Sequence, residues 1–139
     1  MGFSHTLRVR YHESDQMGIV HHSQYVRYLE TARIEWLRHL GFSYRDMETS
    51  GALLVVAQLD IKYRAPARFD DVLDIGVVLT RLTAIRIVLD YVITRPADEA
   101  VIAKGSTTLA SVDTEGQLKV MPESVRSLLG VGSVERLKR

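Results

Sequence analysis

Apolar and polar residues alternate with two different periods along this chain, and the change of period divides it into predicted elements. Between residues 24 and 40, apolar residues recur every three or four positions, which predicts one long amphipathic helix. Ser23 is the expected N-cap, and Gly41 is expected to end the helix. Such a helix would be roughly 25 Å long and could lie across several strands. Its predicted apolar face holds Tyr25, Val26, Leu29, Ala32, Trp36, Leu37 and Leu40, and charged residues such as Arg33 fall largely elsewhere.

After a short predicted helix at about 44–50, the period changes to two. One apolar face per strand is typical of an antiparallel sheet with one packed face. Only Thr83 and Ala84 separate the third strand from the fourth, which predicts a tight hairpin. The pattern therefore predicts an α+β fold of order β-α-β-β-β-β, in which a curved antiparallel sheet wraps the long helix. The predicted strands are 5–11, 53–63, 72–82, 85–95 and 101–112.

Length and composition limit the classes of protein that remain. The chain has 139 residues, so residues 1–139 are expected to form a single domain, with a last helix after Pro122 and a tail at 131–139. A formal net charge of +1 gives no reason to expect a nucleic-acid partner. The first residues contain no apolar signal segment, and no stretch is long and apolar enough to cross a membrane, so we expect a cytoplasmic protein. The absence of cysteine excludes disulfides and thiolate chemistry.

Candidate chemistry is concentrated in residues 11–25, which read YHESDQMGIVHHSQY and join the first strand to the long helix. The N-terminus of a helix offers free backbone N–H groups and a positive dipole end, so it can hold a developing anion. Asp15 is the carboxylate placed near this junction, with Gly18 just after it, whereas Glu13 would point away in an extended chain. A solvated polar loop would contain the same residue types.

These residues resemble the signature of the hotdog-fold acyl-CoA thioesterases of the 4-hydroxybenzoyl-CoA and YbgC-type branch. The family pattern is Y-x-x-x-D, two residues, G-x-V, one further residue and H. A second segment, IKYRAPARFDD at 61–71, is similar to the family's strand-end loop, and the resemblance covers essentially residues 5–125. It implies a hotdog fold and hydrolysis of an acyl-CoA to the free acid and coenzyme A. The pattern is filled in register by Tyr11, Asp15, Gly18, Val20 and His22.

Hydrolysis of a thioester needs an attacking oxygen and a stabilised oxyanion. The resemblance implies that Asp15 either attacks the carbonyl carbon or takes a proton from water, and it leaves this choice open. The backbone amide of His22 is expected to hold the oxyanion, and the His22 side chain to orient water or the thioester. Tyr11 is expected to orient Asp15, although a strand-end or interface tyrosine would fit the same position. The acyl group stays open, since Met17 and His21 depart from the family's common residues.

Contacts to the rest of the substrate are assigned to Gly18, Arg68 and Arg86. Guanidinium groups suit the phosphates of coenzyme A, so Arg64 and Arg81 are candidates for the phosphates as well. Arg68 is the best of the four arginines because it lies in the loop that matches the family. For each arginine, a solvated or ion-paired surface position is the alternative. Coenzyme A is part of the substrate, so no separate cofactor is expected. Metal binding is not expected either, because adjacent histidines at a helix start point in different directions.

The resemblance also implies assembly and leaves other functions open. Proteins of this kind pair two subunits edge to edge, so we expect a homodimer or a dimer of dimers, with residues of 61–68 and 81–87 reaching the neighbouring site. Two alternatives to hydrolysis remain. One is another hotdog enzyme, a dehydratase or hydratase, and the other is a non-catalytic acyl-CoA-binding or scaffold protein.

Overall fold

A computed structural model describes the backbone of residues 2–137 and the side chains of residues 2–130. The predicted tail, 131–139, continues as helix to Leu137, and its last two residues lie outside the described part. The elements are β1 (Phe3–Arg8), the 3-10 helix η1 (Tyr11–Glu13), α1 (His22–His39), α2 (Tyr44–Thr49), β2 (Leu53–Tyr63), β3 (Val72–Leu82), β4 (Arg86–Arg95), β5 (Ala100–Val112) and α3 (Glu123–Leu137).

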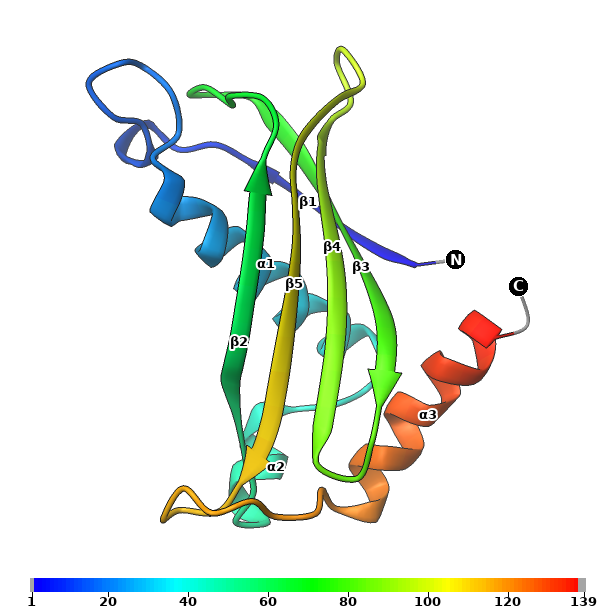
Figure 1. Cartoon of the computed structure of the whole chain (residues 1–139). Helices are drawn as coiled ribbons and strands as arrows, with labels where there is room; N and C mark the ends of the chain where they lie inside the picture. Colours follow the sequence, from blue (N-terminus) through cyan, green and yellow to red (C-terminus); the bar gives the residue numbers. More distant parts are fainter. Residues whose placement is uncertain (1, 138–139) are drawn as a thin grey trace.

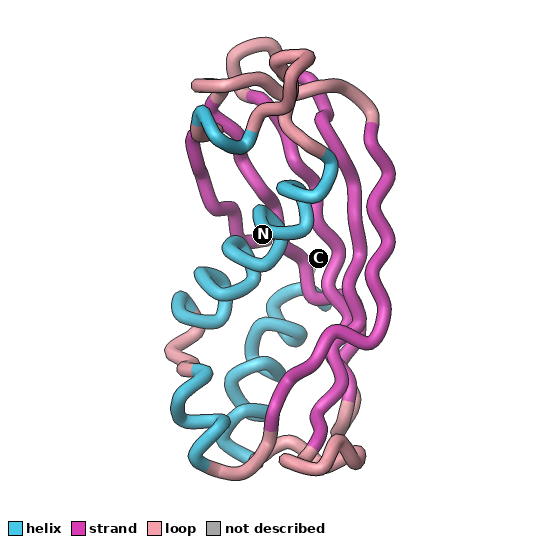
Figure 2. Tube along the Cα trace, turned by 90° about the vertical axis from the view of Figure 1, so that its left-hand side faces the viewer, coloured by secondary structure: helices cyan, strands magenta, loops and turns pink. Residues whose placement is uncertain are grey.

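The five strands form one antiparallel sheet in the order β1-β3-β4-β5-β2. The sheet curves around α1, and the helices lie on one side of it (Figures 1 and 2). We call the face that α1 covers the inner face and the opposite face the outer face. The strands β1 and β2 are the two edges. The predicted α+β architecture, a long helix wrapped by a curved antiparallel sheet, is therefore confirmed.

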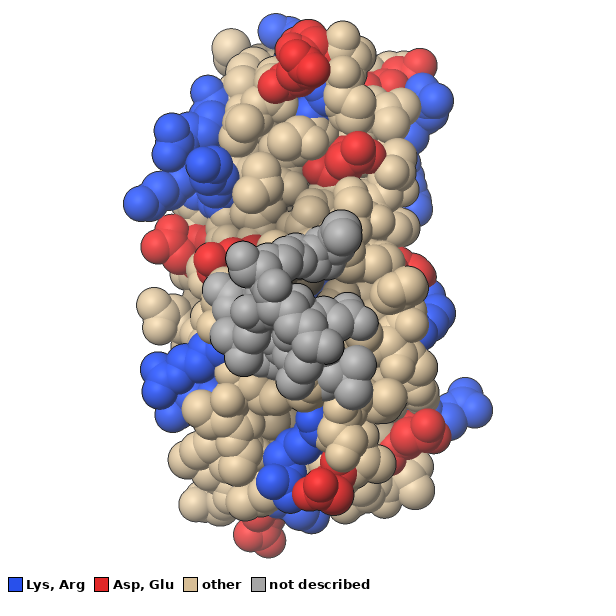
Figure 3. Space-filling model, turned by 90° about the vertical axis from the view of Figure 1, so that its right-hand side faces the viewer, with Lys and Arg blue, Asp and Glu red and all other residues tan. Residues whose placement is uncertain are grey.

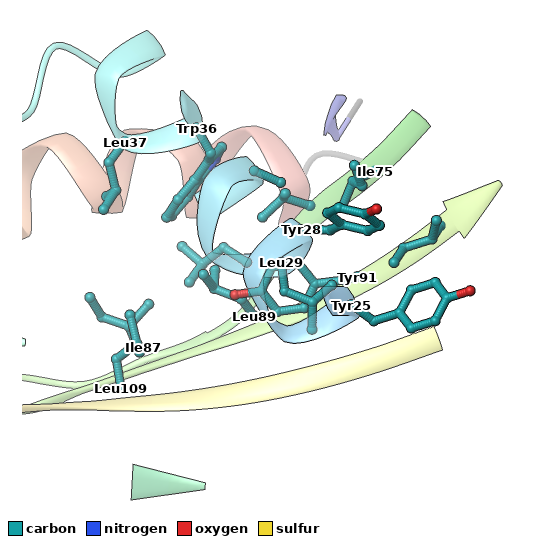
Figure 4. Close-up of a cluster of buried hydrophobic side chains, with 14 of the residues drawn as sticks. Tyr25, Tyr28, Leu29, Trp36, Leu37, Ile75, Ile87, Leu89, Tyr91 and Leu109 are labelled. Carbon is teal, nitrogen blue, oxygen red and sulfur yellow. The ribbon is translucent and has the colours of Figure 1, made fainter. Parts of the chain in front are cut away.

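The core lies between α1 and the inner face of the sheet. Side chains of α1 interdigitate there with alternate residues of the central strands (Figure 4). Gly105 in β5 allows this close approach, since a Cβ atom at this position would lie 3.0 Å from the backbone oxygen of Asp60 and 3.1 Å from Leu29 Cδ1. Burial of this apolar surface fixes the helix on the sheet. The labelled core residues are Tyr25, Tyr28, Leu29, Trp36, Leu37, Ile75, Ile87, Leu89, Tyr91 and Leu109.

Two positions on α1 differ from the predicted helix face. Val26, placed beside the apolar face, is 40% exposed, and Tyr28 is buried in its place. Arg33, placed on the polar face, is only 6% exposed, because it lies between α1 and the sheet beside the hydroxyl of Tyr91. Helical spacing fixes the angle between residues but not which sector a curved sheet will cover.

The ends of two elements also differ from the prediction. The first strand ends at Arg8 rather than residue 11, because Tyr11 begins the 3-10 turn of η1. The helix α1 begins two residues early, and His21 rather than Ser23 is its N-cap. The predicted hairpin between β3 and β4 is confirmed, and the Thr83 hydroxyl oxygen accepts from the Arg86 amide at 2.9 Å.

Candidate active site

The segment before α1 folds into a small hairpin that holds Asp15 in place. The Asp15 amide donates to the Ile19 carbonyl at 2.8 Å, and the Gly18 amide returns a bond to the Asp15 carbonyl at 3.0 Å. Gly18 has a φ of +80°, a left-handed conformation that glycine adopts without strain. The hairpin is joined to the 64–71 segment, because the Val20 amide donates to the Ala67 carbonyl at 2.8 Å. Asp15 therefore sits in an ordered turn.

The 64–71 segment is itself anchored to the end of β4. Arg95 Nη1 donates to Asp71 Oδ2 at 2.9 Å and to the Pro66 carbonyl at 3.1 Å. The Asp71 carboxylate also accepts from the Arg68 amide at 2.9 Å. These charge-assisted bonds connect the turn that holds Asp15 to the rigid sheet.

The carboxylate of Asp15 is half-buried and has one oxygen engaged. Its Oδ1 accepts from the Met17 amide at 2.8 Å and, at a longer 3.4 Å, from the Ile19 amide. No hydrogen bond to Oδ2 is recorded from any residue that the structure describes. The side chain is thus oriented through one oxygen, and the other is available to a reactant.

The start of α1 lies just beyond this turn and has a free backbone donor. His21 Nδ1 accepts from the Ser23 amide at 3.2 Å, and the His21 carbonyl accepts from the Gln24 amide at 2.9 Å. Nδ1 is therefore an acceptor, which puts the proton of neutral His21 on Nε2. The amide of His22 has no recorded acceptor within the described part of the chain. Such an N–H at the positive end of a helix can donate to an anion.

The carboxyl end of β2 is attached to the same helix start. Tyr63 Oη donates to the His22 carbonyl at 3.2 Å, and its ring lies 5.3 Å from that of Tyr25. Tyr25 is buried, and this burial raises the pKa of its hydroxyl. The Tyr63 ring remains half exposed. The edge strand and the helix start therefore form one unit.

Comparison with known proteins decides the family. A family model described as the thioesterase-like superfamily matches residues 9–129. The chain belongs to the thioesterase-like superfamily.

Individual members of the superfamily align over most of the chain. It is 35% identical to a putative acyl-CoA thioesterase YneP of Bacillus subtilis, over 78% of each chain. It is 32% identical to the acyl-CoA thioester hydrolase YbgC of Escherichia coli, over 88% of this chain and 89% of the relative. A crystal structure of a hypothetical protein from Aquifex aeolicus is 33% identical, covers 91% of this chain and 98% of its own, and superposes with a TM-score of 0.85. The sheet order and these likenesses confirm the hotdog fold.

Three of the predicted site residues share the segment that leads into α1, and a fourth approaches it from the 64–71 segment. Asp15, Gly18 and His22 belong to the turn and the helix start, and the Arg68 guanidinium lies 3.9 Å from the position of a Cβ atom at Gly18. Arg86 is at the beginning of β4, at the opposite end of the strand from Arg95. Within one chain, it therefore lies far from the other four.

Tyr11 is placed in the exposed part of the same segment. Its side chain is 79% exposed, and its ring meets that of Phe69 edge-on with centroids 5.4 Å apart. No hydrogen bond between Tyr11 and Asp15 is recorded among the described residues. Its expected role of orienting Asp15 therefore stays a prediction.

Three side chains near the site were missed by sequence reasoning. Glu13 is held toward α1, because its Oε1 accepts from the Arg10 amide at 2.7 Å and from Tyr28 Oη at 2.9 Å. Burial and the Glu13 carboxylate raise the pKa of Tyr28 well above the ordinary tyrosine range. Ser14, beside Asp15, has a buried hydroxyl that finds no hydrogen-bond partner among the described residues. Only its position directly before the aspartate could have drawn attention to it.

Other possible sites on the chain carry less chemistry. A hollow of about 940 Å³ lies between β1 and the first half of α1, and neither Asp15 nor His22 lines it. Over the described residues, no three histidine or acidic side chains come together in a way that could hold a metal ion. None of the described helices combines the length and apolar character needed to cross a bilayer.

Proposed function

We propose that this chain is an acyl-CoA thioester hydrolase that releases a free acid and coenzyme A. The observation that carries the proposal is the arrangement of Asp15 and the start of α1. One carboxylate oxygen of Asp15 is fixed by two backbone amides, and no donor to the other is found among the described residues. The small hairpin that holds Asp15 leads directly into α1, whose first amide, at His22, has no acceptor within the described part of the chain. Membership of the superfamily, and relatives named as acyl-CoA thioester hydrolases, support the substrate class.

Two routes fit the free oxygen of Asp15. In the first, Oδ2 bonds to the carbonyl carbon, the carbon–sulfur bond breaks and the thiolate leaves, which gives a mixed anhydride that water then opens to the acid. In the second, Oδ2 takes a proton from a water molecule as that water attacks the carbonyl carbon, after which the carbon–sulfur bond breaks and the thiolate leaves with the acid as the other product. In both routes, the amides of Met17 and Ile19 hold the carboxylate in one orientation, so little reorganisation is needed at the moment of reaction.

The oxyanion that forms in either route would accept from the His22 amide. In a well-studied acyl-transfer enzyme of another kind, loss of one oxyanion donor costs on the order of 2.7–4 kcal/mol of transition-state stabilisation. The His22 ring is exposed and stacks on the His21 ring at 4.2 Å. In this proposal the ring orients the thioester or a water molecule, which is a separate role from that of the amide.

We also propose that a second copy completes the site. The strand β2 is an eleven-residue edge, and its exposed apolar residues include Val55, Val56 and Leu59 as well as Tyr63. Open edges of this kind readily pair with another strand. Two-fold pairing of the β2 strands would set the amino end of one beside the carboxyl end of the other. Arg86 of the partner subunit would then approach the His22 end, where it could meet a phosphate. A dimer of dimers is a further stage of the same assembly.

The test is a thiol-release assay with a panel of acyl-CoA substrates. Asp15→Asn keeps an oxygen for the Met17 and Ile19 amides but removes the basic oxygen, so turnover should fall by roughly 10²–10⁴-fold or more. Asp113→Asn is a matched control, because Asp113 Oδ1 accepts from the amides two and four residues later in the same way, at 2.8 and 2.9 Å. The control should retain activity.

Three results would contradict parts of the proposal. Unchanged turnover in Asp15→Asn removes this carboxylate from the mechanism. Equal losses in Asp15→Asn and Asp113→Asn point to a structural effect of altering such turns. Binding of coenzyme A without hydrolysis of any thioester in the panel would make the chain an acyl-CoA-binding protein.

A further inference from the structure

Three cations gather on the outer face of the sheet, behind the candidate site. Lys62 in β2 lies directly opposite Lys104 in β5, and Arg64 follows at the end of β2. All three side chains are exposed. Together with neighbouring residues they line an open hollow of about 420 Å³. We call these three residues the outer-face cation cluster. On the face that Figure 3 shows, Lys and Arg side chains gather at the upper left, with acidic side chains directly below them.

The pairing within the cluster is unfavourable by itself. Like charges directly opposite each other on one face of a sheet repel and destabilise the pair. Within the described residues, no carboxylate lies within 4 Å of Lys62, Arg64 or Lys104. The nearest acids on the same face, Asp60 and Asp90, flank Ser106 one step along the strands and line the other part of the hollow. A bound anion would relieve this repulsion at the strand end.

The cluster is separated from the candidate site by one strand. Successive side chains of a strand point to opposite faces, so Lys62 lies on the outer face while Tyr63 lies on the inner face. Arg64 follows the end of β2 and lines the same hollow as Lys62. The Tyr63 hydroxyl donates to the His22 carbonyl. If a second copy covers the β2 edge, a ligand that extends from the inner face to the outer face must pass over the ends of the strands, where Arg64 lies. A ligand with a long uncharged arm and a phosphorylated end could follow this path.

We propose that the outer-face cation cluster binds the phosphate groups of the coenzyme A moiety while the thioester lies at Asp15. This inference rests on the proposed function and deepens it, since it assigns the carrier end of the substrate to Lys62, Arg64 and Lys104. Ammonium and guanidinium groups both donate charge-assisted hydrogen bonds to phosphate. The two acids beside the cluster would repel phosphate from the middle of the sheet and so favour the strand end.

The test compares acyl-CoA with the corresponding acyl-pantetheine, which has the same thioester and arm but lacks the nucleotide. In Lys62→Gln/Lys104→Gln, the KM for acyl-CoA should rise roughly fivefold, since each exposed ionic contact contributes modestly. Its kcat, and the KM for acyl-pantetheine, should stay within about twofold of wild type. Arg27→Gln/Arg38→Gln removes the same charge from exposed positions of α1 and should leave every constant unchanged.

The proposal is overturned if the lysine variant leaves the KM for acyl-CoA unchanged, or if it raises the KM of both substrates equally. A second measurement separates this inference from the proposed function. If wild type hydrolyses no thioester, titration with adenosine 3′,5′-bisphosphate, which carries the nucleotide phosphates alone, still tests the cluster. Weaker binding in the lysine variant than in the arginine control would support the cluster as the phosphate site, and equal binding would overturn it.

Discussion

A buried polar chain between α1 and the sheet allows a quantitative test of how the helix is held. Arg33 Nη1 donates to Tyr91 Oη at 3.4 Å, and Tyr91 Oη shares a hydrogen bond of 2.7 Å with Thr107 Oγ1. Within the described part of the chain, Arg33 Nε has no hydrogen-bond partner. The Glu30 carboxylate is 3.9 Å from Arg33 Nη2 and is mostly exposed. Tyr91→Phe removes one oxygen atom and leaves the shape of the core almost unchanged. Its effect therefore reports on the polar chain.

The size of the effect follows from the two bonds that are lost. A hydrogen bond to a charged group contributes roughly 1.5–3 kcal/mol, and a neutral one about 1 kcal/mol. The 3.4 Å hydrogen bond to Arg33 is long, so its contribution belongs at the lower end of the range for charged groups. Loss of the short hydrogen bond leaves the buried Thr107 hydroxyl without its Tyr91 partner. We expect Tyr91→Phe to lower the free energy of unfolding by about 2–3 kcal/mol. With a typical urea slope of roughly 1–3 kcal/mol/M, the midpoint should fall by about 0.7–3 M.

Urea denaturation of a double-mutant cycle measures this. Arg33→Met removes the buried charge and keeps an unbranched side chain, and replacing a buried charge with an apolar residue is often neutral or stabilising. In the Tyr91→Phe background, Arg33→Met should therefore restore at least half of the lost stability. The reasoning is refuted if Tyr91→Phe changes the free energy of unfolding by less than about 0.5 kcal/mol. It is also refuted if the two substitutions are simply additive.

Three further predictions concern packing, pH and assembly. Gly105→Ala forces a methyl group against the backbone of β2, so urea denaturation should show that the free energy of unfolding falls by about 1–3 kcal/mol. A fall of less than about 0.5 kcal/mol would mean that α1 and β2 move away freely. The folded state raises the pKa of Tyr28, so the stability that the Tyr28 hydroxyl contributes is complete below the unfolded pKa of about 10 and declines as pH rises above that value. Above about pH 10, wild type should therefore lose stability more steeply than Tyr28→Phe, and equal slopes of stability against pH would contradict this. Val56→Lys on the β2 edge should give a monomer in sedimentation velocity, whereas Val78→Lys on the outer face of β3 should stay dimeric; a monomeric wild type would contradict the assembly.

The sequence by itself determined the elements and the position of the candidate chemistry. A period of two or of 3.6 residues is a local property of the backbone, so the long helix and the strands could be recognised without knowledge of their partners. The motif that contains Asp15, Gly18 and His22 is also local, because a turn and the helix that follows it are set by neighbouring residues. The family resemblance extended this to the hotdog fold.

Only the tertiary structure decided which faces are buried and which distant residues meet. Arg33 looked like a surface residue until the curvature of the sheet covered its side of α1, and Tyr63 gave no sign that it would bind the carbonyl of His22. In an extended strand Glu13 would point away from the site, whereas the 3-10 turn of η1 brings its carboxylate to the hydroxyl of Tyr28. Such contacts depend on strand register and on the exact placement of a helix across a curved sheet. Those quantities arise from packing over the whole chain, and no local pattern of residues encodes them.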